Sequence, residues 1–152
     1  MKHRIAVGAL VIDNENRLLM VNHKKENCYD FWVAPGGGVV ETESQEAAVI
    51  REVKEETGLD VAVGELMYIE EFWQPTIREV KFWYLCDLQG GNLDSSAEEA
   101  IREHIVDAQF ITREALGQLT VFPEIVVERL WSDIQQPLRA PVYIGLRKMA
   151  FY

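Results

Sequence analysis

Residues 37–59 read GGVVETESQEAAVIREVKEETGL, and this stretch decides the local fold. Thr42, followed three residues later by Gln45, fits a capping box, in which both side chains bind free backbone N–H groups at a helix start. Acidic side chains in the first turn suit the positive end of the helix dipole. Helix-forming residues continue as far as Gly58, the residue type that commonly ends a helix. The stretch therefore predicts a glycine-rich loop followed by a helix over residues 42–57.

Three glutamates of this helix, Glu52, Glu55 and Glu56, stand at relative positions i, i+3 and i+4. They fall within an arc of about 100° on one side of the helix, with neighbouring Cβ atoms ~5–6 Å apart. Like charges this close destabilise a bare helix, and burial makes one carboxylate hold its proton. A bound Mg²⁺ or Mn²⁺ removes the penalty, because hard cations prefer carboxylate oxygens. The crowding indicates a divalent-metal site, with a solvated acidic face as the alternative.

The spacing within the stretch is more specific than the acids alone. Gly37 is followed after five residues by Glu43, and seven further residues precede the run REVKEETGL. This pattern resembles the Nudix box at every position, and the match covers the 23 residues from Gly37 to Leu59. The fixed positions are Gly37, Glu43, Arg51, Glu52, Glu55, Glu56 and Gly58, and the aliphatic ones are Val53 and Leu59. The chain is therefore similar to the Nudix hydrolase family.

The resemblance implies a role for each acid of the box. In the family, a glycine-rich loop leads into a helix whose glutamates bind the metals that hold a diphosphate. Carried over, the metal ligands would be Glu52, Glu55 and Glu56, with the carbonyl oxygen of Gly37 as a further ligand. Arg51 would orient these acids through ion pairs, and Arg51 and the three glutamates form the expected catalytic set. The implied cofactor is Mg²⁺ or Mn²⁺.

Two features beside that set stay open. In the family, water activation falls either to a glutamate at the Glu52 position or to a separate acid further along the chain. The sequence offers Glu98, Glu99 and Glu103 as such acids and does not choose among them, because most charges in such loops are only solvated. Glu43 can fix the loop against the helix, which is the favoured reading, or serve as an N-terminal dipole partner.

The remaining segments predict strands on both sides of this helix and then two further helices. β-Branched and aromatic runs indicate strands over 4–13, 17–23, 31–34, 61–74, 78–88 and 104–111, of which the first two look like a hairpin. Residues 24–30 and 90–102 are predicted loops, 112–119 and 123–135 are predicted helices, and the form of 142–152 is left open. This order favours an α/β fold with a mixed β-sheet and helices on its faces. The resemblance implies a Nudix-like α/β/α sandwich that forms one domain over residues 1–152.

The composition is that of a folded, acidic protein. The chain has 152 residues, of which 48% are hydrophobic and 26% charged, so it can bury the core of one ordinary domain. Its formal net charge of -10 repels RNA and DNA, which disfavours nucleic-acid binding. A small phosphorylated substrate stays compatible with this charge if a divalent cation screens it locally.

Nothing in the sequence indicates a membrane or an oxidising compartment. Cys28 and Cys86 form no CxxC motif, and two reduced cysteines are the simplest interpretation. The longest apolar stretch, residues 5–12, contains Gly8 and is too short to span a bilayer. Basic residues precede it, but no small-residue cleavage site follows, so we expect no signal peptide and a cytoplasmic protein.

Substrate-binding residues stay undefined at this level. Strand aromatics that could stack on a base are Phe31, Trp32, Phe72, Trp73, Trp83 and Tyr84, although such residues more often fill a core. Arginines that could reach a phosphate or a terminal sugar are Arg4, Arg17 and Arg78, and each is equally explained as an exposed charge. His23 and His104 have no assigned role.

The leading interpretation is a hydrolase that uses metal-activated water to cleave a phosphoanhydride bond in a nucleoside diphosphate linked to another group. Nucleotide sugars, ADP-ribose-like compounds and nucleoside triphosphates all fit that description. The alternative is a Nudix-fold module that binds or senses a nucleotide without cleaving it. Gaps would then be expected among Glu52, Glu55 and Glu56, and none is missing. A purely structural acidic helix would leave the spacing from the glycine loop unexplained. The expected partner is a small nucleotide-type substrate, and the resemblance leaves a homodimer open.

Overall fold

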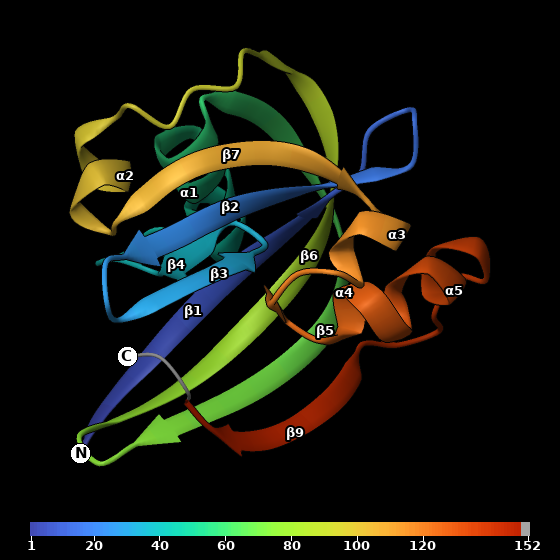
Figure 1. The fold of residues 1–152 in the computed structure, drawn as a ribbon. Coiled ribbons are helices and arrows are strands. Elements are labelled where there is room, and N and C mark those ends of the chain that lie inside the picture. Colours follow the sequence, from blue (N-terminus) through green and yellow to red (C-terminus); the bar gives the residue numbers. More distant parts are fainter. Residues whose placement is uncertain (150–152) are drawn as a thin grey trace.

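The computed structural model describes residues 1–149, and in this range it contains two β-sheets and five helices (Figure 1). In spatial order, the first sheet contains β4 (Gly36–Gly38), β1 (Lys2–Val11), β6 (Ile77–Gly91), β5 (Leu59–Gln74) and β9 (Val142–Lys148). The second sheet contains β7 (Ile105–Thr112), β2 (Arg17–Lys25), β3 (Tyr29–Val33) and β8 (Val121–Phe122). The helices are α1 (Gln45–Thr57), α2 (Glu98–Arg102), α3 (Arg113–Leu116), α4 (Ile125–Glu128) and α5 (Leu130–Gln135).

Both sheets are mixed. In the first, β1 pairs in parallel with β6 and antiparallel with β4, β5 is antiparallel to β6, and β9 joins the other edge of β5 in parallel. In the second, β2 pairs antiparallel with β3 and β7, whereas β8 is parallel to β3. The expected α/β class with mixed strands is confirmed, although the strands divide between two sheets.

Burial against β1 holds the first helix in place. Alternate residues of β1, among them Val7 and Val11, share a core with Val49 and Val53 of α1. Leu10 points to the opposite face of β1 and joins the core that contains residues of α3, α4 and α5. Figure 1 shows α1 and the α3–α5 group on separate sides of the strands. Burying a valine side chain contributes about 1.5–3 kcal/mol, so these contacts outweigh the repulsion among acids on the same helix.

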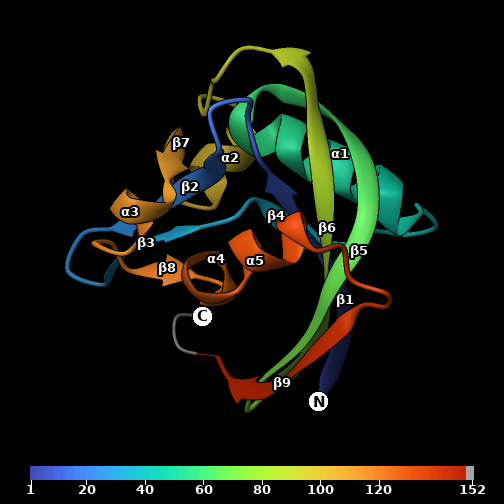
Figure 2. The same cartoon turned by 90° about the vertical axis from the view of Figure 1, so that its right-hand side faces the viewer.

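Four strands of the first sheet extend beyond the helices. Figures 1 and 2 show β1, β5, β6 and β9 as one long curved sheet whose far end projects away from α1. From this end, Phe72 and Lys81 line one cavity together with Phe31 and Phe122 of the second sheet, and Arg4 lines the adjoining cavity with Lys81. A cleft therefore lies between the projecting end of the first sheet and the strands β3 and β8.

The predicted hairpin over residues 4–13 and 17–23 is wrong. Ile12 and Leu18 form a single bridge beside the turn, but β1 and β2 then separate into different sheets. Both strands are buried along most of their length and pair with other strands on both edges. The choice of partner is therefore set by this packing and not by the turn between β1 and β2. β2 instead forms a hairpin with β3, and part of the predicted loop 24–30 is strand.

The start predicted for the first helix is also wrong. The helix begins at Gln45, because the Ser44 hydroxyl accepts the Ala47 N–H at 3.0 Å and Ser44 has an extended backbone. Thr42 lies outside the helix, so the predicted capping box does not form. The predicted end is confirmed, since Gly58 adopts a left-handed conformation with φ of 77° and its N–H donates to Lys54 O.

Further boundaries differ where distant contacts decide them. The predicted loop 90–102 ends in α2, the helix predicted over 112–119 shortens to α3, and the helix predicted over 123–135 divides into α4 and α5. Short helices of this kind depend on packing rather than on their own propensity. Of the segment 142–152, left open by the sequence, residues 142–148 form β9, and residues 150–152 lie outside the described residues. Within residues 1–149, no helix has the length and apolar character needed to cross a membrane.

Replacing Ser44 by Ala is expected to lower the free energy of unfolding by about 1 kcal/mol, because the helix loses its side-chain cap. Thr42→Ala is the matched control, since it removes the hydroxyl of the residue that the sequence favoured as the cap. Urea denaturation followed by circular dichroism compares the two variants. Equal loss in both, or loss only in Thr42→Ala, would contradict the observed helix start.

Candidate metal centre and substrate cleft

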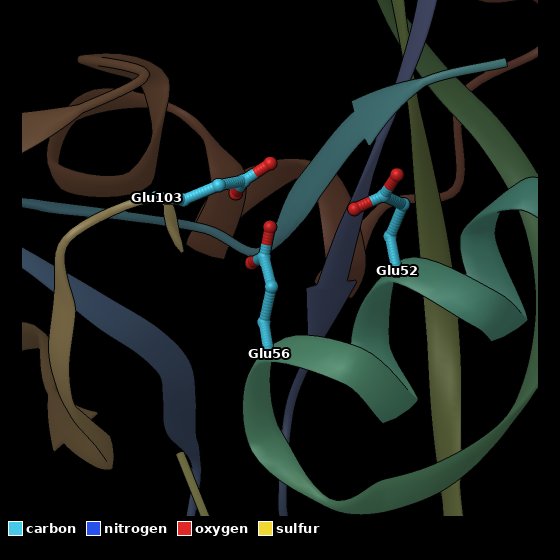
Figure 3. Close-up of side chains that lie close together, drawn as sticks. All are labelled: Glu52, Glu56 and Glu103. Carbon is cyan, nitrogen blue, oxygen red and sulfur yellow. The ribbon is translucent and has the colours of Figure 1, made fainter. Parts of the chain in front are cut away.

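Two helix residues and one loop residue bring their carboxylates together. Figure 3 shows Glu52 and Glu56 on successive turns of α1, with Glu103 reaching them from the segment that follows α2. One oxygen atom from each of the three side chains lies within 4.8 Å of the others. Glu52 is 6% exposed and Glu56 is 2% exposed, whereas Glu103 is more open to solvent. Buried carboxylates at this separation form a candidate site for a hard divalent cation.

The glycine-rich strand β4 lies directly against these acids. A Cβ atom added to Gly37 would stand 2.6 Å from the carboxylate of Glu52, so only glycine leaves room for that side chain. The Gly36 N–H donates to Glu56 Oε2 at 3.3 Å. β4 itself is held by antiparallel pairing with β1, in which Gly37 lies opposite Val7. The fixed glycine of the box therefore allows backbone and carboxylate to approach closely.

Arg51 binds the acids on the other side of the cluster. Its guanidinium donates to Glu52 Oε1 at 2.8 Å and to Glu55 Oε2 at 3.2 Å. It also donates to Gly38 O at 3.0 Å and to both carboxylate oxygens of Glu43, at 2.6 and 3.1 Å. Arg51 thereby ties the glycine strand, the helix and three of the box acids together.

Glu43 is a fixed structural partner in this arrangement. Its Oε1 accepts the Val40 N–H at 2.9 Å in addition to the bonds from Arg51. These bonds from Arg51 lower the pKa of Glu43 below its usual value. The geometry agrees with the reading in which Glu43 fixes the loop against the helix.

The three clustered acids have raised pKa values, in contrast to the lowered pKa of Glu43. Burial raises the pKa of Glu52, and burial together with repulsion from Glu103 and Glu52 raises the pKa of Glu56 well above its usual value. Partial burial likewise raises the pKa of Glu103. Within residues 1–149, Glu56 Oε1 is buried and has no hydrogen-bond partner. An orphaned oxygen among crowded carboxylates fits a Mg²⁺ or Mn²⁺ ion, which would be held by oxygen atoms alone.

Of the three downstream acids that the sequence left open, the structure brings only Glu103 to the cluster. Glu98 is exposed and pairs with Arg102 at 3.5 Å. Glu99 is also exposed and lies on the rim of the site. Glu55 stands outside the group of three as well, but it lines a solvent-facing cavity that Glu52 and Glu103 also line.

His23 contributes to the placement of Glu103. Its Nδ1 lies 3.1 Å from the backbone oxygen of Glu103, and its ring is stacked on Phe31 with 5.3 Å between centroids. Burial lowers the pKa of His23 to about 4, so the ring is neutral at physiological pH. A neutral Nδ1–H can donate to this carbonyl and hold the loop that carries Glu103.

Two adjoining cavities form a cleft between the acids and an aromatic pocket. Its inner part is lined by Gly36, Gly37 and Glu103, and its outer part by Phe72, Trp83 and Phe122. Both parts share the side chains of Glu79 and Lys81 on β6. A ligand in this cleft can therefore contact the acids at one end and aromatic rings at the other.

The structure separates the aromatic and basic residues that the sequence left open. Phe31, Phe72 and Trp83 line the cleft, as does Arg4, which pairs with Glu79 at 3.3 Å. The other residues are engaged elsewhere: Trp32 packs beside the core, Tyr84 donates to Gln45, Arg17 pairs with Asp13 and Glu15, and Arg78 pairs with Glu71. Trp73 lies next to Lys148, and His104 lines the inner cleft.

The cleft is also lined by residues that no sequence pattern singled out, among them Lys81, Phe122 and Arg147. Lys81 stands two positions before Trp83 in the same strand, so strand alternation could have placed both side chains on one face. Phe122 and Arg147 reach the cleft through parallel pairings of β8 with β3 and of β9 with β5. Such pairings join segments far apart in the chain, so no local sequence pattern predicts them.

Comparison with known proteins agrees with this architecture. The model of the NUDIX domain matches residues 2–130. The chain is 36% identical over 149 residues to the 8-oxo-dGDP phosphatase NUDT18 of Danio rerio, an alignment that covers 94% of this chain and 45% of that protein. It is 33% identical over 94 residues to the ADP-ribose pyrophosphatase of Methanocaldococcus jannaschii, covering 59% of this chain and 56% of that protein. The chain thus spans about half the length of these two curated relatives.

A solved structure shows the same fold. The crystal structure of a NUDIX hydrolase from Nitrosomonas europaea superimposes with a TM-score of 0.77 at 16% identity, covering 98% of this chain and 81% of that one. The chain has this α/β architecture and a complete Nudix box that carries two of the three clustered acids. It therefore belongs to the Nudix family.

Replacing Glu56 by Gln is expected to stabilise the metal-free protein at neutral pH by about 1–3 kcal/mol, because folding of the wild type must either bury the Glu56 charge without a full set of partners or take up a proton. The raised pKa of Glu56 means that the folded state holds a proton which the unfolded state releases, so wild-type stability falls as pH rises above the usual carboxyl value. The advantage of the variant should therefore grow between pH 5 and pH 8.

Denaturation with urea in the presence of chelator measures this difference. Glu55→Gln is the control, since Glu55 is partly exposed and paired with Arg51, and its effect should stay within about 0.5 kcal/mol. A Glu56→Gln variant that is less stable than the wild type at pH 8 would show that the carboxylates do not repel one another in the folded state.

Proposed function

We propose that this domain hydrolyses a phosphoanhydride bond in a nucleoside diphosphate linked to another group, with water as the nucleophile and Mg²⁺ or Mn²⁺ as the cofactor. The observation that carries the proposal is the group of three carboxylates, Glu52, Glu56 and Glu103, beside a glycine strand and at the inner end of a cleft. The negative charge of a diphosphate repels an attacking nucleophile. Bound cations neutralise that charge and lower the pKa of a bound water.

We assign Glu52, Glu55 and Glu56 as metal ligands, with the Gly37 carbonyl as a further one. Glu103 joins them as the acid supplied from outside the box. Glu55 is half-buried and lines the same cavity as Glu52 and Glu103, where its carboxylate could help to hold a cation. Arg51 keeps Glu52 and Glu55 in place by ion pairs at 2.8 and 3.2 Å.

In the proposed reaction the oxygen of water bonds to one phosphorus, and the bridging P–O bond breaks. Glu52 or Glu103 accepts the proton of the water, a role that typically contributes ~10²–10⁴-fold. Both carboxylates have a raised pKa, which makes them stronger bases than an exposed glutamate. The leaving phosphate can be met by Arg4 or Lys81, whose side chains line the same inner cleft.

A module that only binds nucleotides is the alternative, and the site gives no support to it. In such a module the crowded acids would only destabilise the fold, because their repulsion costs stability when no cation is bound. Here the box is complete, and a further acid lies beside it. The relatives act on an 8-oxo-dGDP and on an ADP-ribose, so both guanine-type and adenine nucleotides enter as candidate substrates. The net charge of -10 favours such small substrates over nucleic acids. We also propose that the enzyme is cytoplasmic.

Phosphate release from a panel of nucleotide sugars, dinucleotides, ADP-ribose and nucleoside di- and triphosphates, each assayed with a coupling phosphatase, tests the proposal. At least one compound is expected to be cleaved in the presence of Mg²⁺ or Mn²⁺, and chelator should abolish that activity. Tight nucleotide binding without cleavage across the whole panel would support the binding module instead.

Glu52→Gln, Glu55→Gln and Glu56→Gln are each expected to lower kcat/KM by at least about 10²-fold, because charge neutralisation and water activation are each worth several kcal/mol. Glu46→Gln is the control, since Glu46 is an exposed glutamate at the start of the same helix. Steady-state kinetics on the best substrate of the panel provides the measurement. Undiminished turnover in Glu55→Gln and Glu56→Gln would refute the assigned roles.

A further inference from the structure

We propose that the C-terminal strand β9 completes a nucleobase pocket at the outer end of the cleft, and that Arg147 on this strand selects guanine over adenine. The proposal rests on the function proposed above, because it names the base of a nucleotide whose phosphates lie at the acid cluster. β9 lies beyond residues 2–130, where the family model matches, and therefore outside the Nudix box.

The pocket has flat aromatic walls supplied by both sheets. Phe72 comes from β5 and Trp83 from β6 of the first sheet, while Phe31 and Phe122 come from β3 and β8 of the second. The rings of Phe31 and Phe122 meet edge to face at 5.5 Å between centroids. Trp83 and Phe31 are 1% and 2% exposed, so a planar heteroaromatic ring would be buried chiefly against the more open rings of Phe72 and Phe122.

The distance to the acid cluster is bridged by shared residues. Glu79 and Lys81 line both the aromatic pocket and the inner cleft that contains Gly37 and Glu103. A base held among the aromatic rings therefore has an open path for its sugar and phosphates toward the acids. Lys81, with its ammonium 4.5 Å from the Trp83 ring, stands where that path begins.

Arg147 is held over the pocket from β9. In the register of β9 against β5, Arg147 lies opposite Phe72. Its guanidinium stands 4.8 Å from the Phe72 ring and 5.5 Å from the Phe122 ring, so it is placed over two walls of the pocket. Glu70, which is 3% exposed, anchors it through an ion pair of 3.6 Å. This anchor fixes the position of a flat group that carries several N–H donors.

The donors of Arg147 favour one pattern on a base. Among residues 1–149 its side chain makes the ion pair with Glu70 and no hydrogen bond, so N–H groups stay free for a ligand. Guanine presents two neighbouring acceptors, O6 and N7, which a guanidinium can bind together. Adenine presents an amino group in place of O6, and that donor would face the donors of Arg147.

A carboxylate in the same pocket complements this pattern. Glu79 is buried, lines the pocket, and uses Oε2 for its ion pair with Arg4 at 3.3 Å. Its other oxygen can accept N–H groups, which guanine carries on its ring nitrogen and its amino group. The pocket thus offers donors to the carbonyl side of the base and an acceptor to its amino side.

Calorimetric titration with the α,β-methylene analogues of GDP and ADP, in the presence of Mg²⁺, tests the proposal without any turnover. Wild-type protein is expected to bind the guanine analogue more tightly by about 5- to 100-fold, the range for a bidentate contact to a base. Arg147→Ala should remove most of this preference by weakening the guanine analogue alone. Arg147→Lys should behave like Arg147→Ala, because an ammonium lacks the planar fork.

Arg139→Ala is the matched control, since Arg139 is exposed and lies outside the pocket, and this variant should keep the wild-type preference. Circular dichroism establishes that each variant is folded. Equal binding of the two analogues by the wild type, or an equal loss of both in Arg147→Ala, overturns the proposed selection. Failure of the proposed function is distinguishable, because a protein that cleaves nothing in the panel can still be titrated with both analogues.

Discussion

The arrangement of this site depends on negative charges that the fold forces together where water is scarce. Packing of α1 against β1 outweighs their repulsion and keeps Glu52 and Glu56 on successive turns. Arg51 offsets part of the charge, since it contacts Glu52 and Glu55, but it makes no contact that relieves Glu56 within residues 1–149. The unbalanced charge is therefore greatest where Glu56 meets Glu103, and a cation in that place would reverse the cost.

The glycine strand and the helix are parts of one device. β4 is pinned by β1, Gly37 leaves space for the carboxylate of Glu52, and Arg51 joins the strand to the helix through Gly38 and Glu43. Each of these contacts removes freedom from an acid that would otherwise turn away from its neighbours. Preorganisation of this kind lets a site bind a cation without first ordering its ligands.

The sequence predicted the parts of the structure whose causes are local. Helix periodicity placed Glu52 and Glu56 together, and Gly58 marked the end of the helix. The helix start was missed because Thr42 and Ser44 are both good caps, and only the backbone decides between them. Glu103 could not be separated from its acidic neighbours, since the turn that brings it to α1 depends on the packing of α2. Arg147 lies outside any local signal, because its strand pairs with residues about seventy positions earlier.

The late position of β9 in the chain has a consequence for the order in which the protein is assembled. During synthesis, the residues that gather the acids leave the ribosome well before residues 142–148 do. At that stage the chain already carries Glu52, Glu56 and Glu103, while Arg147 has not yet emerged. The acid cluster and the proposed base selection thus lie in separate segments of the polypeptide, and the second requires β9 to pair with β5.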